Sequence, residues 1–195
     1  MLFNKGGYPG SRPGFDSFGA IDVNFIPDSA HLHKAGYAIL AYDQRTHGRS
    51  CSNWGETSIV GAHESRDVAS AMRFLSTWGP TRDMEVALYL RWMGANSGIA
   101  AFKNFPQDMA PARAFVDLQP VSAGAFVAKA ADGTGVDVAK ALQGFDKGVW
   151  AVIGLRAADL PPQSSIAHVK IPTLVAQVKD DVLVDAPKDT QGGDL

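Results

Sequence analysis

The stretch VALYLRWMGANSGIAAF, residues 86–102, decides the fold class because it passes from a strand pattern through a turn into a helix pattern. Val86 to Met93 is a short and nearly continuous apolar run, which is typical of a strand covered on both faces. A helix is expected to begin at the Asn96-Ser97 turn and to run towards Phe105, because Pro106 cannot continue it. The stretch therefore predicts a strand, a tight turn and a helix in that order.

The same alternation extends along the chain in both directions. Apolar runs bounded by turn residues predict three more strands, at Tyr37 to Asp43, Ala112 to Pro120 and Pro172 to Val178. Helical patterns span Asp28 to Gly36, with Asp28 or Ser29 as the N-cap, and His63 to Gly79. Strands that alternate with helices predict an α/β fold with a mostly parallel, doubly wound sheet flanked by helices.

Residues 121–169 interrupt this alternation, since they contain no convincing strand. The stretches Val136 to Phe145 and Val149 to Leu160 are typical of two short helices. They suit a helical cap inserted over the carboxyl edge of the sheet, and equally one more crossover between strands. Because 195 residues suffice for one buried core, residues 1–195 are expected to form a single domain that includes this insert.

The composition excludes several classes of function. With 46% hydrophobic residues, 19% charged residues and a net charge of -2, the chain gives no electrostatic reason to expect a nucleic-acid partner. No apolar run reaches the ~18 residues of a membrane span, and the single cysteine, Cys51, excludes a disulfide within the chain. His31 and His33 lack further metal ligands, so neither a metal nor a cofactor is predicted. A cytoplasmic location is expected.

Four segments carry a resemblance to a known superfamily. In chain order they are GGYPGS, DQRTHGRS, MGANSG and IPTLVAQVKDD, at residues 6–11, 43–50, 93–98 and 171–181. They resemble the oxyanion loop, the loop after the fourth strand, the nucleophile elbow and the acid-bearing strand of α/β-hydrolases such as serine esterases and lipases. The resemblance covers nearly the whole chain. It implies an α/β-hydrolase-like fold whose loops converge on one cleft at the carboxyl ends of the strands.

The resemblance also assigns roles to individual residues. It implies an oxyanion hole at Gly7 and Tyr8, with the backbone N–H groups of Tyr8 and Ser97 as donors, and Asp181 as the catalytic acid. The central elbow position, which normally carries serine, is Asn96, and Ser97 follows it. Three interpretations remain open: Ser97 presents its hydroxyl, Asn96 positions an attacking water, or Ser97 only caps the helix.

The catalytic base has no residue at its usual place. In this superfamily the histidine follows the acid, whereas none of the five histidines follows Asp181. An unconventional pair of Ser97 and His47 is one hypothesis, and a structural role of His47 is the alternative. The chain thus resembles the middle of a larger α/β-hydrolase or a reduced relative. A homodimer that completes the sheet and lends a histidine is a further hypothesis.

Two functions follow from these residues. The resemblance implies a hydrolase of carboxylic esters or related acyl compounds, with a small-molecule substrate in the cleft under the cap. The alternative is a noncatalytic α/β-hydrolase relative that binds a small molecule or a protein, as Asn96 at the elbow and the missing histidine suggest. Apolar residues of the insert favour a hydrophobic group in the ligand: Phe126, Phe145, Trp150 and Ile153.

Overall fold

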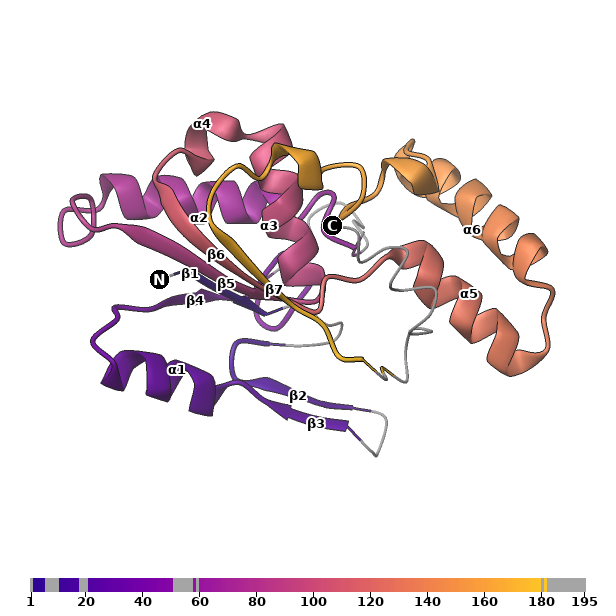
Figure 1. Cartoon of the computed structure of the whole chain (residues 1–195), viewed down its shortest axis with the longest axis horizontal. Coiled ribbons are helices and arrows are strands. Elements are labelled where there is room, and N and C mark those ends of the chain that lie inside the picture. The colour runs from indigo at the N-terminus through magenta and orange to yellow at the C-terminus, as the bar shows by residue number, and fades with distance from the viewer. Residues whose placement is uncertain are drawn as a thin grey trace.

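The computed structural model describes residues 2–5, 11–17, 21–50, 58, 60–179 and 181. Within these residues, five strands form one sheet in the order β4-β1-β5-β6-β7, and every pair of neighbours is parallel (Figure 1). The strands are β1 (Leu2–Lys5), β4 (Leu40–Tyr42), β5 (Val86–Arg91), β6 (Ala112–Leu118) and β7 (Thr173–Ala176). The predicted mostly parallel sheet is therefore confirmed.

Helices cover both faces of this sheet. In Figure 1, α2 and α3 lie on one face and α1 lies on the other, as a doubly wound fold requires. Their bounds are α1 (Ile26–Lys34), α2 (Ser65–Thr77), α3 (Met93–Asn104) and the short α4 (Pro106–Met109). The segments between α6 and β7 include two short 3-10 helices, η2 (Ala157–Asp159) and η3 (Ile166–His168).

The core lies between β5 and the helices α2 and α3. Alternate residues of β5 are buried, and Leu88 and Leu90 have no exposed surface. Full burial of a leucine side chain contributes about 1.5–3 kcal/mol. A side chain at Gly98 would collide with Leu90, so this glycine allows α3 to pack directly on β5. The N-terminus of α3 is thereby fixed at the carboxyl end of β5.

The start of the chain differs from the sequence-based expectation in two ways. Helix α1 begins at Ile26 with Phe25 as its N-cap, so neither Asp28 nor Ser29 caps it; Pro27 favours this earlier start because its fixed φ suits the first turn. In addition, β2 (Gly14–Ser17) and β3 (Ile21–Asn24) form an antiparallel hairpin that the sequence analysis missed. Each of these strands has only four residues and lacks the continuous apolar run on which the other strand predictions rest.

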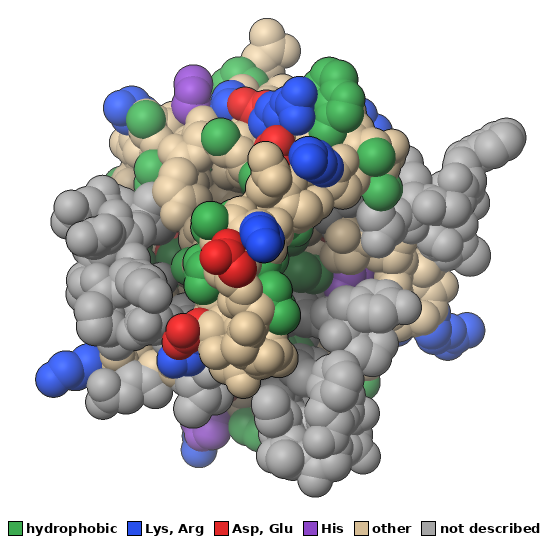
Figure 2. Space-filling model, turned by 90° about the vertical axis from the view of Figure 1, so that its right-hand side faces the viewer, with side chains coloured by type: hydrophobic (Ala, Val, Ile, Leu, Met, Phe, Trp, Pro, Cys, Tyr) green, Lys and Arg blue, Asp and Glu red, His purple; other side chains and the backbone are tan. Residues whose placement is uncertain are grey.

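Within residues 121–169, which also include η2 and η3, a helical hairpin extends past the carboxyl end of β6 (Figure 1). It consists of α5 (Ala123–Thr134), which the sequence analysis missed, and α6 (Val138–Ile153). The two predicted short helices are wrong in their bounds, because a single helix runs through both stretches until Gly154 ends it in the left-handed conformation. Figure 2 shows this side of the molecule, where hydrophobic side chains reach the surface between charged ones.

Candidate functional site

The strand-to-helix turn after β5, here called the elbow, lies at Trp92, and Asn96 lies inside α3. Strand β5 ends at Arg91 and α3 begins at Met93, so a single residue makes the strand-to-helix turn. Trp92 has φ 53 and ψ -125, a strained conformation for a residue with a side chain. In α/β-hydrolases the nucleophile occupies a strained turn of this kind. Trp92 makes this turn between β5 and α3, and the predicted helix start at the Asn96-Ser97 turn is wrong because α3 begins at Met93.

Asn96 lies inside α3 and ties that helix to the start of the helical hairpin. Its side chain is fully buried, its Nδ2 donates to the Val121 carbonyl at 2.7 Å, and its Oδ1 accepts from the Val121 N–H at 3.2 Å. Both ends of the amide are thus bound to one backbone residue. This geometry is that of a structural clamp.

Ser97 is likewise enclosed in the body of α3. Its hydroxyl donates to the Met93 carbonyl at 2.6 Å and lies 3.5 Å from Gln44 Oε1, and the residue has no exposed surface. Gly61 covers it, since a side chain at Gly61 would collide with the Ser97 backbone nitrogen. As the fifth residue of α3, Ser97 has a backbone N–H within the helical hydrogen-bond pattern. The first N–H after the elbow belongs instead to Met93.

Asp181 is linked to the elbow through Gln119. The Trp92 indole Nε1 donates to Gln119 Oε1 at 3.2 Å, and Gln119 Nε2 donates to Asp181 Oδ2 at 3.3 Å. Gln119 directly follows β6, and its backbone N–H donates to the Ala176 carbonyl at the end of β7. Three neighbouring strand ends therefore bring together an indole, an amide and a carboxylate. Neither the indole nor the amide ionises near neutral pH, so neither can act as a general acid or base.

His47 lies in the loop after β4 and is 2% exposed. Its Nδ1 is 2.8 Å from the Arg45 carbonyl, which assigns the proton to Nδ1, and 3.3 Å from Thr46 Oγ1. The residue of this loop that the Ser97 hydroxyl contacts is Gln44. Gly7 and Tyr8, the predicted oxyanion loop, lie outside the described residues.

A buried carboxyl group that the sequence analysis did not consider lies beneath α3. Asp117 of β6 is paired in register with Leu90 of β5 and is fully buried. Among the described residues, no hydrogen-bond partner reaches either of its side-chain oxygens. Burial raises the pKa of Asp117 from 3.8 to about 7, because the low-polarity surroundings disfavour the charged form.

Trp92 and Gln119 escape prediction from the sequence for different reasons. Read from the end of β5, the elbow window is LRWMG, which retains only the last of the two glycines in the usual pattern. The stretch GANSG, one helical turn later, matches both glycines of the pattern, so the sequence predicts the elbow at that place. The signal that identifies Trp92 is its position directly after the buried strand. Gln119 has no local signal, since its role depends on contacts between separate strand ends.

The structure contains an apolar pocket beside the elbow, here called the α6 pocket. It has a volume of about 230 Å³ and lies between α6 and the segment that contains Ser58 and Val60. Ser58 Oγ is 3.8 Å from the sulfur of Met93, the residue after the elbow. The pocket is lined by Ser58, Val60, Phe145, Gly148, Val149, Val152, Ile153 and Leu160.

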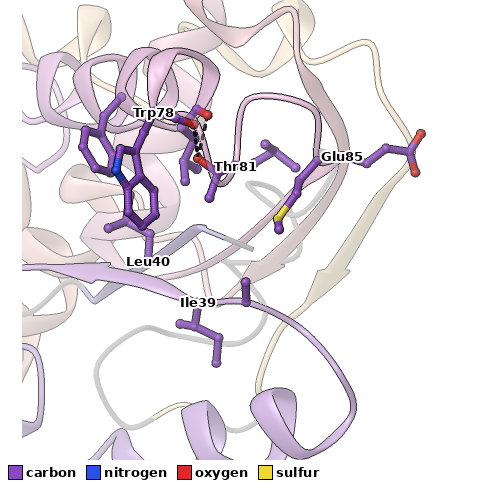
Figure 3. Close-up of a pocket in the computed structure, with 10 residues that line it drawn as sticks. Ile39, Leu40, Trp78, Thr81 and Glu85 are labelled. Atoms are coloured by element: carbon purple, nitrogen blue, oxygen red, sulfur yellow. Dashed lines mark hydrogen bonds between the residues drawn. The ribbon is translucent and has the colours of Figure 1, made fainter.

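A smaller pocket of about 110 Å³ lies at the opposite edge of the sheet (Figure 3). Ile39 and Leu40 line it from the start of β4, and Trp78 and Thr81 line it from the end of α2 and the following loop. The labelled Glu85 points away from these residues in Figure 3. Because this pocket is at the amino ends of the strands, it is separate from the elbow.

In the part of the chain that the structure describes, no cluster of three or more metal-ligating side chains occurs. The same residues include no helix that is long and apolar enough to cross a membrane.

Comparisons with known proteins identify the fold. No protein-family model and no curated protein sequence matches the chain. Two structures of the Pyrococcus furiosus esterase Pf2001 superpose with TM-scores of 0.63 and 0.62 at 18% and 21% identity. The first superposition covers 99% of this chain and 66% of Pf2001, so the chain spans slightly less than two thirds of that esterase. Acetyl xylan esterase 1 from Thermoanaerobacterium sp. JW/SL YS485 has a TM-score of 0.55 at 12% identity, over 92% of this chain and 68% of that one. The chain therefore has an α/β-hydrolase-like fold.

Proposed function

We propose that the chain binds a small ester or acyl compound in a hydrolase-type cleft without forming a covalent acyl intermediate. The observation that carries this proposal is Trp92 at the elbow. Covalent acyl transfer needs a nucleophile such as a hydroxyl, thiol or carboxylate on this turn, whereas an indole offers only an N–H donor. Since Gln119 accepts that N–H, the elbow favours recognition over nucleophilic attack.

The α6 pocket supports an apolar chain as part of the ligand. Val149, Ile153 and Leu160 give it an apolar lining, and α5 with α6 acts as the cap over this side of the cleft. Each buried methylene contributes about 0.8 kcal/mol, so a chain of about five carbons gains about 4 kcal/mol before the cost of association. A neutral acyl compound with a medium-length alkyl chain fits this chemistry.

A binding experiment with hexanamide, an acyl compound that esterases do not hydrolyse readily, tests the proposal. Gly148 lines the pocket and Gly144 does not, yet an added Cβ meets no heavy atom within 4 Å at either position. Gly148→Leu therefore fills the pocket, and Gly144→Leu is its matched control one turn earlier. We expect NMR titration to show equal affinity for the wild type and Gly144→Leu, and about tenfold weaker affinity for Gly148→Leu, a loss of about 1.4 kcal/mol.

Two outcomes of this titration contradict the proposal in different ways. If the wild type does not bind hexanamide, the ligand class is wrong. If all three proteins bind it equally, the ligand occupies another place and the α6 pocket is not the site.

Hydrolysis by a directly attacking water is the second candidate function. It is favoured by Asp181, whose carboxylate lies at the same sheet edge as the elbow, and by the N–H of Met93 as an oxyanion donor. The assay is hydrolysis of p-nitrophenyl butyrate by the wild type and the Asp181→Asn, His47→Ala and Ser97→Ala variants. Activity that only Asp181→Asn abolishes supports water attack. Loss in both Ser97→Ala and His47→Ala would support that pair, and an inactive wild type supports the noncatalytic binder.

A further inference from the structure

Two residues with positive φ angles are in contact at the elbow. Trp92 follows β5 and Gln119 follows β6, and each has φ 53 although neither is glycine. Such conformations persist where the surrounding structure enforces them, and they cluster at functional sites and ligand clamps. Here the two strained residues are joined by their side chains, through the indole N–H and Gln119 Oε1 at 3.2 Å.

Gln119 makes hydrogen bonds to groups that follow β5 and β7 and to the end of β7 itself. Its Oε1 accepts from Trp92, its Nε2 donates to Asp181 at 3.3 Å, and its backbone N–H donates to the Ala176 carbonyl at 2.8 Å. Trp92, Gln119 and Asp181 are each partly exposed, so this row of groups reaches the surface at the carboxyl ends of the strands. An amide suits the central position because it presents an acceptor to the indole and a donor to the carboxylate at once.

We propose that Gln119 is a positioning residue that fixes the Trp92 indole across the elbow, and that this fixed indole shapes the part of the site that receives the polar end of an acyl ligand. This inference rests on the proposed binding function. Without the Gln119 acceptor, the indole loses its fixed orientation and Asp181 loses a donor. The ligand's carbonyl then meets a mobile ring, so affinity falls even though the α6 pocket is unchanged.

The indole N–H signals in a ¹⁵N NMR spectrum report directly on this contact. The chain has four tryptophans, and the signal that disappears in Trp92→Phe belongs to Trp92. In Gln119→Leu, we expect this signal to shift and its hydrogen exchange to accelerate up to about tenfold, because one hydrogen bond is lost. An unchanged signal and exchange rate would overturn the inference.

The Gln119→Glu variant separates positioning from a general effect on folding. At acidic pH the introduced carboxyl group is neutral and offers both a carbonyl acceptor and an O–H donor, as the amide does. At acidic pH we expect the Trp92 signal at its wild-type position. At higher pH we expect the signal to move away from this position, because the ionised group is repelled by the Asp181 carboxylate and leaves its place beside Trp92. A signal in this variant that does not change with pH would contradict the inference, and the comparison holds even if Gln119→Leu fails to fold.

Hexanamide binding distinguishes this inference from the function on which it rests. If the wild type does not bind hexanamide, the proposed function fails irrespective of the NMR result. If the wild type binds it, we expect about tenfold weaker binding by Gln119→Leu, with thermal unfolding as the control for folding. Equal affinity in the two proteins would leave the proposed function intact and overturn the role of Gln119.

Discussion

At the scale of single residues, Asp117 is a carboxylic acid enclosed between the sheet and α3. Its pKa is raised by burial from 3.8 to about 7, so the folded protein favours the protonated form. In the unfolded chain the group ionises at lower pH. The contribution of Asp117 to the free energy of unfolding is therefore greatest below pH 3.8 and decreases as the pH rises towards 7. Above that pH the contribution no longer changes. The difference of about three pKa units corresponds to about 4 kcal/mol.

The Asp117→Asn variant should remove this pH dependence. Asparagine has nearly the same shape and never ionises, so we expect it to match the wild type near pH 4 and to exceed its free energy of unfolding at pH 8 by up to about 4 kcal/mol. Urea unfolding at the two pH values measures this, with Asp83→Asn as the control because the Asp83 side chain is 87% exposed. A destabilised Asp117→Asn protein at pH 8 would show that the native carboxylate has a stabilising partner.

The residues around the elbow differ in how far the sequence alone predicts their positions. Asp181 follows a recognisable strand and lies two hydrogen bonds from the elbow, and its role as the catalytic acid stays a prediction. Trp92 was missed because tryptophan is not a residue that motif patterns seek at an elbow. Gln119 and Asp117 depend on which side chains meet across strands β5, β6 and β7, and that information is not local in the sequence.

At the scale of elements, helix α3 connects the elbow to the helical hairpin. Its Asn96 makes two hydrogen bonds to the backbone of Val121, immediately before α5. The strands that frame α3 are predictable from the sequence, since β5 and β6 are short and mostly apolar runs bounded by turn residues. The start of α3 is not, because the turn residues Gly94 to Gly98 fold as its first helical turns.

Asn96→Ala should weaken the link between α3 and the hairpin. The substitution leaves the Val121 N–H and carbonyl without their partner, and each lost hydrogen bond costs about 0.5–1.5 kcal/mol. We expect the free energy of unfolding to fall by about 1–3 kcal/mol and the midpoint of thermal unfolding to fall by several degrees. Asn96→Asp keeps the acceptor for the Val121 N–H but places a buried carboxylate against the Val121 carbonyl, so at neutral pH it should be no more stable than Asn96→Ala. Wild-type stability in the alanine variant would exclude the clamp.

At the scale of the whole molecule, the two edge strands of the sheet, β4 and β7, are the places where a second chain could pair. In the described part of the chain, β4 pairs only with β1 and β7 pairs only with β6. Strand β7 also exposes apolar side chains, with Leu174 63% and Val175 41% exposed. Exposed strand edges with apolar side chains favour pairing with another chain. The hypothesis of a homodimer that extends the sheet therefore concerns β7 in the first place.

Sedimentation velocity over a range of concentrations tests this association. We expect the wild-type chain to form dimers as its concentration rises, and Val175→Lys to weaken them at least about tenfold, because a charge on an edge strand opposes pairing and one unfavourable contact of about 1.4 kcal/mol suffices. Val136→Lys is the matched control, since Val136 is 51% exposed in the connection between α5 and α6. A monomer at every concentration, or equal loss in both variants, would remove β7 as an interface. In that case a second copy could not contribute a histidine to the site by pairing at β7.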